Sequence, residues 1–307
     1  MLKKVKVTNY LGKSVEYTLE GPTIEDESGL FITGINGLGP VKATVNMTQL
    51  ATADGDIWNS TRLAGRNIVL NARFTYARTI EEARLMSYKF FPIGKKVTFH
   101  IETDNRMAET EGYVESNEPN IFSKESDMQV SILCESPWFS SVDEDGKQKT
   151  DFSNVVATFE FPFSNESTSE SLIEFGQIIN KKESTVYYDG DAETGCLITL
   201  HAIGAVEMVT IYNIRTGDKM VLDTDKLETL TGDKIIAGDT IVINTVKGGK
   251  YIRLIREGVT TNILNILGKD AEWFQLAKGD NLFAYTAEYG EANIQFSVET
   301  QILFEGV

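Results

Sequence analysis

The chain is poor in the side chains that most often carry out chemistry, with only 2 histidines and 2 cysteines in 307 residues. His100 and His201 stand far apart, and no C-x-x-C or H-E-x-x-H spacing accompanies them, so a zinc site has no local support. No G-x-S-x-G elbow is present to pair a nucleophile with either histidine. We therefore expect no catalytic residue, no cofactor and no metal site. Paired carboxylates that hydrolyse sugars stay open, because their spacing is set in three dimensions.

The two cysteines, Cys134 and Cys196, lie far apart in the sequence and in what we interpret as different domains. We expect two buried or half-buried thiols in a reducing compartment and no disulfide.

Long hydrophobic runs are also missing. No stretch approaches the ~18 apolar residues that a membrane-spanning helix requires. The N-terminal residues MLKKVKVTNYLGKSVEY carry lysines without an apolar segment or a small-residue cleavage site after them. We expect no signal peptide, no membrane insertion and synthesis in the cytoplasm.

Positive charge is the third shortage. The chain has 29 Lys and Arg against 45 Asp and Glu, a formal net charge of −16, and most of the excess lies beyond residue 140. Phosphate affinity depends on concentrated cations, so we expect no sequence-specific nucleic-acid binding. The hydrophobic fraction of 41% still fits a globular protein with a full core.

The clearest pattern is a strand, a helix and a second strand between Gly65 and Arg106. Residues 67–76 alternate apolar and polar side chains, as a half-buried strand does. Thr79 and Glu82 fit a capping box, which predicts a helix at about 79–91 that ends at Pro92 and Gly94. Alternation resumes over residues 95–102. We also predict a hairpin in which 3–10 and 15–19 pair, a strand at 41–50, and a polar turn at 52–60.

Residues 140–151 (SSVDEDGKQKTD) are charged and lack any period, which marks a domain boundary. From Gly190 onward, short strands alternate with Gly/Asp turns, a pattern typical of an antiparallel sandwich. Residues 262–267 fit either a strand or a helical turn. We predict a mainly β chain with one short helix, divided into residues 1–140, a linker at 141–150, and 151–307.

One group of arginines precedes and enters the predicted helix. This group has too few cations for a nucleic-acid-binding patch, and neighbouring glutamates balance its charge. Arginine is well suited to hydrogen bonding with the carboxylates of a partner protein. The candidate contact residues, for a neighbouring subunit or another partner, are Arg62, Arg66, Arg73 and Arg78.

The chain resembles a known family in an ordered set of short motifs along nearly its whole length. None of these motifs is specific alone. They are Gly37 to Val41, Asp54-Gly55, Arg66 to Val69, Glu81 to Arg84, Gly112 to Glu115, Cys134 to Phe139, Gly190 to Gly195, Gly238-Asp239, Ile241 to Thr245, Gly248 to Lys250, Leu276, Gly279, Asn281 and Phe304 to Val307. The set is similar to that of the distal tail proteins of phages that infect Gram-positive bacteria.

The resemblance implies a first domain that closes into a six-membered belt and a second domain that is a galectin-like β-sandwich. It also implies a structural role at the tail tip of the virion. There the ring would join the tail-tube protein to the tail-associated lysin or receptor-binding protein, around the channel for DNA and the tape measure protein. The alternative is a carbohydrate-binding protein that recognises the host surface through the C-terminal sandwich.

Overall fold

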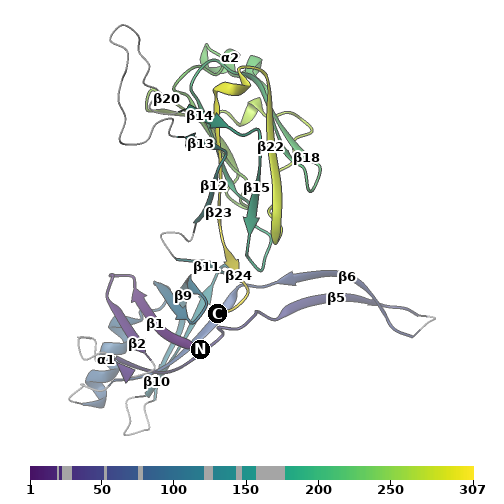
Figure 1. Ribbon diagram of the computed structural model, residues 1–307. Helices are drawn as coiled ribbons and strands as arrows, with labels where there is room; N and C mark the ends of the chain where they lie inside the picture. The colour runs from purple at the N-terminus through teal and green to yellow at the C-terminus, as the bar shows by residue number, and fades with distance from the viewer. Residues whose placement is uncertain are drawn as a thin grey trace, which may run out of the picture. The chain divides into compact units, whose positions relative to one another are not determined.

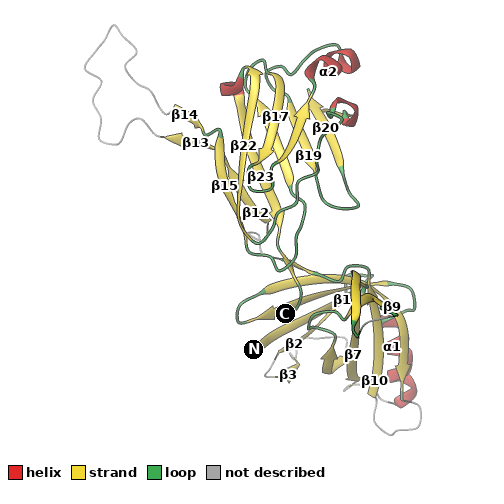
Figure 2. Ribbon diagram, turned by 90° about the vertical axis from the view of Figure 1, so that its right-hand side faces the viewer, coloured by secondary structure: helices red, strands yellow, loops and turns green. Residues whose placement is uncertain are grey.

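The computed structural model describes residues 1–18, 21–22, 30–51, 54–74, 79–120, 127–142, 147–156 and 177–307. These residues form two compact units. The first consists of Met1–Gly146 together with Leu303–Val307, and the second of Lys147–Ile302. Both are built mainly from antiparallel strands, which confirms the predicted mainly β fold class (Figure 2).

The first unit contains a ten-stranded sheet. Eight strands form its main path in the order β3-β2-β1-β8-β9-β10-β7-β4, and β11 and β24 pair beside β9. The bounds are β1 Leu2–Asn9, β2 Ser14–Thr18, β3 Gly21–Pro22, β4 Leu30–Asn36, β7 Arg66–Phe74, β8 Lys96–Thr103, β9 Met107–Pro119, β10 Asp127–Cys134, β11 Phe139–Ser141 and β24 Leu303–Phe304. The predicted hairpin is confirmed as β1 and β2, and the predicted strand at 95–102 as β8. The predicted strand at 67–76 is confirmed as β7 up to Phe74; residues 75 and 76 lie outside the described residues.

The sheet curls, so that strands distant in its order approach each other. Tyr17 on β2 meets Phe31 on β4 edge to face, with ring centroids 5.9 Å apart. Buried side chains alternate with half-buried or exposed ones along β1, β8 and β10. Val7, Leu70 and Phe99 are among those fully buried. Burial of this apolar face stabilises the unit at roughly 25 cal/mol per Å² removed from water.

Helix α1 (Ile80–Phe90) confirms the predicted helix, and it begins where the capping box predicts. The Thr79 side chain accepts a hydrogen bond from the Glu82 backbone N–H, as an N-cap does. Ala83, Ser87 and Phe90 form its buried face. The Asn117 side chain on β9 donates to the carbonyls of Ser87 and Phe91 and so fixes the end of the helix.

Strands β5 (Ala43–Gln49) and β6 (Asp56–Leu63) form a separate two-stranded sheet. They pair only with each other among the described strands, and in Figure 1 they run out as a long ribbon. The prediction of a polar turn over 52–60 is wrong for residues 56–60, which belong to β6. Asp54-Gly55, with Gly55 at φ +98°, lies at the turn between the two strands.

The second unit is a β-sandwich, as predicted. A six-stranded sheet has the order β12-β23-β16-β19-β20-β21, a four-stranded sheet has the order β15-β22-β17-β18, and β13 and β14 form a ribbon. The bounds are β12 Lys147–Asp151, β13 Ser153–Val156, β14 Gln177–Asn180, β15 Glu183–Tyr188, β16 Leu197–Ala202, β17 Glu207–Asn213, β18 Asp218–Leu222, β19 Thr240–Asn244, β20 Tyr251–Arg256, β21 Val259–Asn262, β22 Gly279–Tyr289 and β23 Ile294–Gln301.

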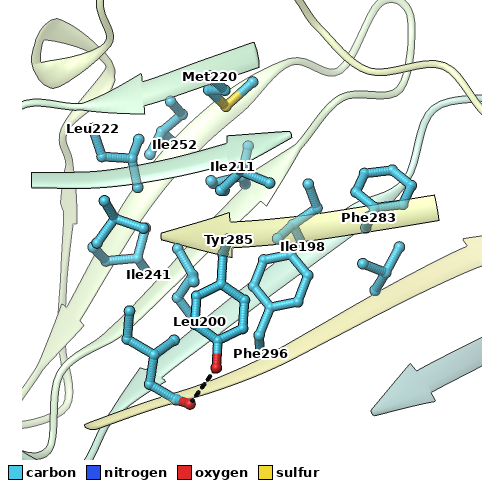
Figure 3. Packing of buried hydrophobic residues seen from close by; sticks show 14 of the residues in the cluster. Ile198, Leu200, Ile211, Met220, Leu222, Ile241, Ile252, Phe283, Tyr285 and Phe296 are labelled. Carbon is cyan, nitrogen blue, oxygen red and sulfur yellow. Dashed lines mark hydrogen bonds between the residues drawn. The ribbon is translucent and has the colours of Figure 1, made fainter. Parts of the chain in front are cut away.

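Side chains from both sheets interleave in one core (Figure 3). Tyr285 on β22 stacks on Phe296 on β23, with centroids 5.2 Å apart, and its hydroxyl donates to the Ile294 carbonyl. Cys196 is fully buried in this core, and burial raises the pKa of its thiol to about 12. Cys134 is buried in the first unit, and both cysteines are free, as predicted.

A second α-helix, α2 (Thr224–Thr231), is a feature that the prediction of one helix missed. Asp223 caps its first turn and Gly232 ends it with φ +91°. Residues 262–267, left undecided above, contain the end of β21 and a 3-10 turn, η1 (Leu264–Ile266); a second 3-10 turn, η2 (Glu291–Asn293), precedes β23.

The unit boundary differs from the predicted domains at both ends. The break between residues 146 and 147 falls within the predicted linker, but Lys147–Asp151 is a strand of the six-stranded sheet rather than linker. The C-terminal residues Leu303–Val307 belong to the first unit, because Phe304 pairs with Phe139 on β11. The second unit is therefore inserted within the first along the chain.

Candidate assembly surface

The ribbon formed by β5 and β6, which we call the arm, exposes nearly every side chain. Only Ala43 and Leu63 at its base are half-buried, and the other residues of both strands are exposed. Eight residues of β6 give it a length of about 26 Å. An isolated two-stranded ribbon is only marginally stable in water. The arm therefore has the character of a surface that another body covers.

One face of the arm carries the large apolar side chains of Val45, Met47 and Trp58, together with Gln49, Asp56 and Thr61. Directly opposite residues of an antiparallel pair point to the same side, and Met47 lies opposite Trp58 while Val45 lies opposite Thr61. Trp58 is 61% exposed and Met47 56% exposed. The indole N–H donates to the Thr61 hydroxyl at 2.9 Å, which holds the ring against this face.

The other face is mainly polar, and its side chains bond to one another. Asn46 donates to the Ser60 hydroxyl at 2.9 Å, and Asn59, at the bulge of the ribbon, donates to the Thr48 hydroxyl at 2.6 Å. Ile57 is the large apolar residue on this side, opposite Thr48. The two faces thus differ in chemistry although both are exposed.

The structure places three of the four arginines that the sequence groups together, and it separates them. Arg62 lies exposed on β6, opposite Thr44 on the polar face of the arm. Arg73 on β7 forms an ion pair with Asp127 on β10, with 2.7 Å between Nε and Oδ1. Arg78 lies outside the described residues. Arg62, Arg66 and Arg73 do not make a single patch.

Arg66 is the fourth, and it is buried, with 1% of its surface exposed. Its guanidinium donates to the carbonyls of Gly37, Gly39, Pro137 and Glu305, at 2.6 Å for Gly39 and Glu305. It also lies 4.0 Å from the centroid of the Phe139 ring. Burial lowers the pKa of Arg66 from its usual value. These bonds are all made within the chain, so the side chain joins segments of its own unit and is not available to a partner.

The C-terminal segment is held by a second arginine that the sequence reasoning did not single out. Arg106 donates to the Gly306 carbonyl at 2.7 Å and lies 4.5 Å from the centroid of the Phe304 ring. The Val307 backbone N–H donates to the Leu38 carbonyl. No periodic signal marks this segment, because β24 has only two residues.

A groove of about 140 Å³ lies on the first unit where β1, β8 and β9 run side by side. Its lining mixes aliphatic and charged groups: Lys4, Lys6, His100, Ile101, Glu102, Met107, Ala108 and Val142. Met107 is 45% exposed. Lys4 and Lys6 share one carboxylate, Glu16, at 2.8 and 3.8 Å, and His100 faces Glu109 at 3.0 Å.

Within the described part of the chain, no group of three or more His, Cys, Asp and Glu side chains could hold a metal ion. His201 on β16 contacts the Thr240 hydroxyl at 3.0 Å, in the other unit from His100. Among the same described residues, no helix is long and apolar enough to cross a membrane.

No protein-family model matches the chain, and no curated protein matches it. Several solved structures do match the chain. The chain is similar to the crystal structure of the SPP1 Dit (gp 19.1) protein, described as a paradigm of the hub adsorption apparatus in Gram-positive infecting phages. The TM-score is 0.66 at 11% identity, over 98% of this chain and 99% of that one.

Weaker similarity extends to chains of the phage P2 baseplate in its activated conformation. With Ca the TM-score is 0.45 at 8% identity, over 97% of this chain and 98% of that one. With Sr it is 0.43 at 9% identity, over 97% of each chain. At 11% identity, the likeness to SPP1 Dit establishes a shared fold over the full length of both units.

Proposed function

We propose that the chain is a structural distal tail protein, the hub at the tail tip of a phage or phage-like particle. The observation that carries this is the agreement of the whole chain with SPP1 Dit, both units included, at a TM-score of 0.66. A likeness limited to one sandwich would say little, because β-sandwiches serve many functions. Agreement of two different units in one order is far more restrictive.

In this role the chain is not an enzyme and needs no cofactor. Copies close head to tail into a ring of six, in which the first unit forms the belt, and the second unit is a galectin-like domain. A rotationally repeated contact between two different patches closes into a ring when the rotation fits. The partners are the tail-tube protein, the tape measure protein and the tail-associated lysin or receptor-binding protein.

Arg62 is the one arginine of the four that we assign to partner contact. It is exposed on the arm. Arg66, by contrast, is buried and donates its hydrogen bonds within its own unit, and Arg73 forms an ion pair with Asp127. A planar guanidinium on an exposed strand suits a carboxylate of a neighbouring protein.

Labelling of particles tests the location. An antibody raised against the purified chain, conjugated to gold, is expected to mark one end of the tail in negative stain. Label along the whole tail, on the head, or on no particle would reject the hub assignment.

The carbohydrate-binding alternative concerns the second unit. The outward side of its six-stranded sheet presents His201, Tyr251 and Arg253, and the Arg253 guanidinium lies 4.2 Å from the Tyr251 ring centroid. The Tyr251 ring is half-buried, and such a ring beside hydrogen-bond donors is a surface that a sugar can stack on. Titration of the full chain with cell-wall polysaccharide tests it. Binding lost in Tyr251→Ala supports it, and a flat titration of the wild type rejects it.

A further inference from the structure

The hairpin formed by β19 and β20 is positively charged, although the chain as a whole is acidic. Residues 240–256 hold four Lys and Arg and no Asp or Glu, whereas the net charge of the chain is −16. The four cations are Lys247, Lys250, Arg253 and Arg256. Arg256 is occupied inside the unit, because its Nη2 lies 2.7 Å from Asp239 Oδ2 and also donates to the Lys234 carbonyl. The other three cations are exposed.

These three exposed cations form no ion pair with any described residue. The acids that border the hairpin are Glu193, Glu257 and Glu299; Glu257 lies in the turn after β20, and Glu299 lies on β23 opposite Leu197. A cation that no carboxylate of its own chain neutralises is available for a charge-assisted hydrogen bond to an anionic ligand. The hairpin is therefore a local site for negative charge on an acidic protein.

Aromatic rings lie against two of the three cations. The Arg253 guanidinium is 4.2 Å from the Tyr251 ring centroid, and the Lys250 Nζ is 5.2 Å from the Trp273 ring centroid. Tyr251 and Arg253 alternate with buried residues of β20, so both lie on the outward side of the six-stranded sheet. Lys250 lies in the turn at the Tyr251 end of that side. A ring next to a cation can contact the apolar face of a sugar while the cation binds its acidic group.

The neighbouring strands add hydrogen-bonding groups without negative charge. On the outward side, β16 and β19 present Thr199, His201, Thr240 and Val242. The His201 Nδ1 lies 3.0 Å from the Thr240 hydroxyl, and its Nε2 makes no hydrogen bond within the described part of the chain. Hydroxyl and imidazole groups can donate to and accept from the hydroxyls of a sugar.

The charge of the whole chain separates two kinds of anionic polymer. Duplex DNA carries one negative charge per about 1.7 Å of its axis. A chain with a net charge of −16 repels such a polymer over most of its length, and three cations do not compensate for that. A polysaccharide with one acidic group per repeat unit has far fewer charges over the same length. The hairpin can bind its acidic groups while neutral sugars lie elsewhere on the sheet.

We propose that the outward side of the six-stranded sheet binds an anionic polysaccharide that carries one acidic group per repeat unit. Arg253 binds the acidic group, Lys250 and Lys247 attract the next one along the polymer, and the Tyr251 ring stacks on a sugar. This inference rests on the carbohydrate-binding alternative given above and names the chemical class of its ligand.

Titration with two fractions of wall polymer tests the class of ligand. Cell-wall polysaccharide of the host bacterium is separated on an anion exchanger into an anionic and a neutral fraction, and each is titrated into the full chain in a calorimeter. We expect binding of the anionic fraction alone, with an affinity that falls about 10-fold or more as NaCl is raised from about 50 to about 500 mM. Binding of the neutral fraction, or binding that does not change with salt, would overturn the proposed class.

Matched variants test the residues. Arg253→Gln removes a cation from the proposed surface, and Lys219→Gln removes one from an exposed position on β18 in the other sheet of the same unit. Both side chains are exposed, so neither change is expected to unfold the chain. We expect Arg253→Gln to weaken binding of the anionic fraction about 10-fold, as loss of one charge-assisted hydrogen bond does, and Lys219→Gln to bind as the wild type does. Equal effects of the two substitutions would overturn the assignment of Arg253.

Duplex DNA of about 30 base pairs is the competing polyanion in the same titration. DNA that binds as tightly as the anionic fraction would overturn the proposal in favour of a general affinity for polyanions. Absence of binding by both wall fractions would overturn this inference and the carbohydrate-binding alternative together. The hub assignment does not depend on any of these titrations, because gold labelling of particles decides it.

Discussion

Arg66 places a cation inside the first unit with backbone carbonyls as its acceptors. Five hydrogen bonds to four carbonyls join residues 37–39, Pro137 and Glu305, which are distant in the sequence. A hydrogen bond from a charged donor stabilises the folded state more than a neutral one does. Removal of the guanidinium leaves each of these carbonyls without that hydrogen bond. Arg66 therefore links three segments of the first unit that are distant in the sequence.

We expect Arg66→Met to destabilise the first unit by about 3 kcal/mol, since it strands buried carbonyls. For a unit of this size that lowers the Tm of its transition by roughly 6 to 12 °C. Calorimetry measures the change. Arg62→Met, at an exposed site, is the control and should stay within about 0.5 kcal/mol of wild type. Equal effects of the two substitutions would contradict the account of Arg66.

Cys196 makes the folding stability of the chain depend on pH in the alkaline range. Its thiol has a pKa of about 12 in the folded protein against a usual value of 9.0, because burial disfavours the thiolate. The raised pKa contributes stability fully below pH 9, and that contribution is lost as pH rises from about 9 toward 12. We expect the stability difference between wild type and Cys196→Ala to shrink over this range in urea unfolding. A stability difference between the two chains that stays constant from pH 9 to pH 12 would contradict this expectation.

At the scale of elements, sequence reasoning succeeds where a local signal and a buried face agree. Residues 67–74 alternate and become β7, and Thr79 with Glu82 starts α1. It fails for β24, whose position is set by Arg66 and Arg106 and by pairing with Phe139, none of them near it in the sequence. It also missed α2, although Asp223 and Gly232 are an ordinary start and stop signal.

The residues of the candidate assembly surface divide in the same way, into those that the sequence identifies and those that it misses. Arg62 was identified from composition, but the neighbouring Met47 and Trp58 were not, since an arm exposed on both faces does not show the alternation of a half-buried strand. Asp54-Gly55 was the available hairpin signal. Arg66 was identified as a contact residue, yet its burial depends on loops brought together only in the fold.

The segment Leu303–Val307 is an element of the first unit supplied from the far end of the chain. We expect Phe304→Ala to cost about 3 kcal/mol, because it removes a buried ring that Arg106 packs against. Hydrogen exchange should show faster exchange in β9 and β11 and unchanged exchange in β19 and β20. Gln301→Ala, at an exposed position of β23, is the control. Faster exchange in the second unit alone would contradict the assignment of this segment to the first.

At the scale of the whole molecule, the net charge of −16 opposes the proposed assembly, whereas burial of the exposed apolar side chains of the arm would favour it. Salt screens repulsion between copies, with a Debye length of about 10 Å at 0.1 M, and leaves apolar contact intact. We expect light scattering to show a larger share of rings as NaCl is raised. Assembly that weakens with salt would indicate that ion pairs, such as one made by Arg62, hold the ring instead.

The central claim is that copies of this chain close on one another into a belt of six. The mass of the purified full-length protein, measured by light scattering at two concentrations, tests it most directly. The account predicts a particle near six times 34.1 kDa that appears as a ring with a central opening in negative stain. A mass of 34.1 kDa at both concentrations, with no ring in stain, would contradict it.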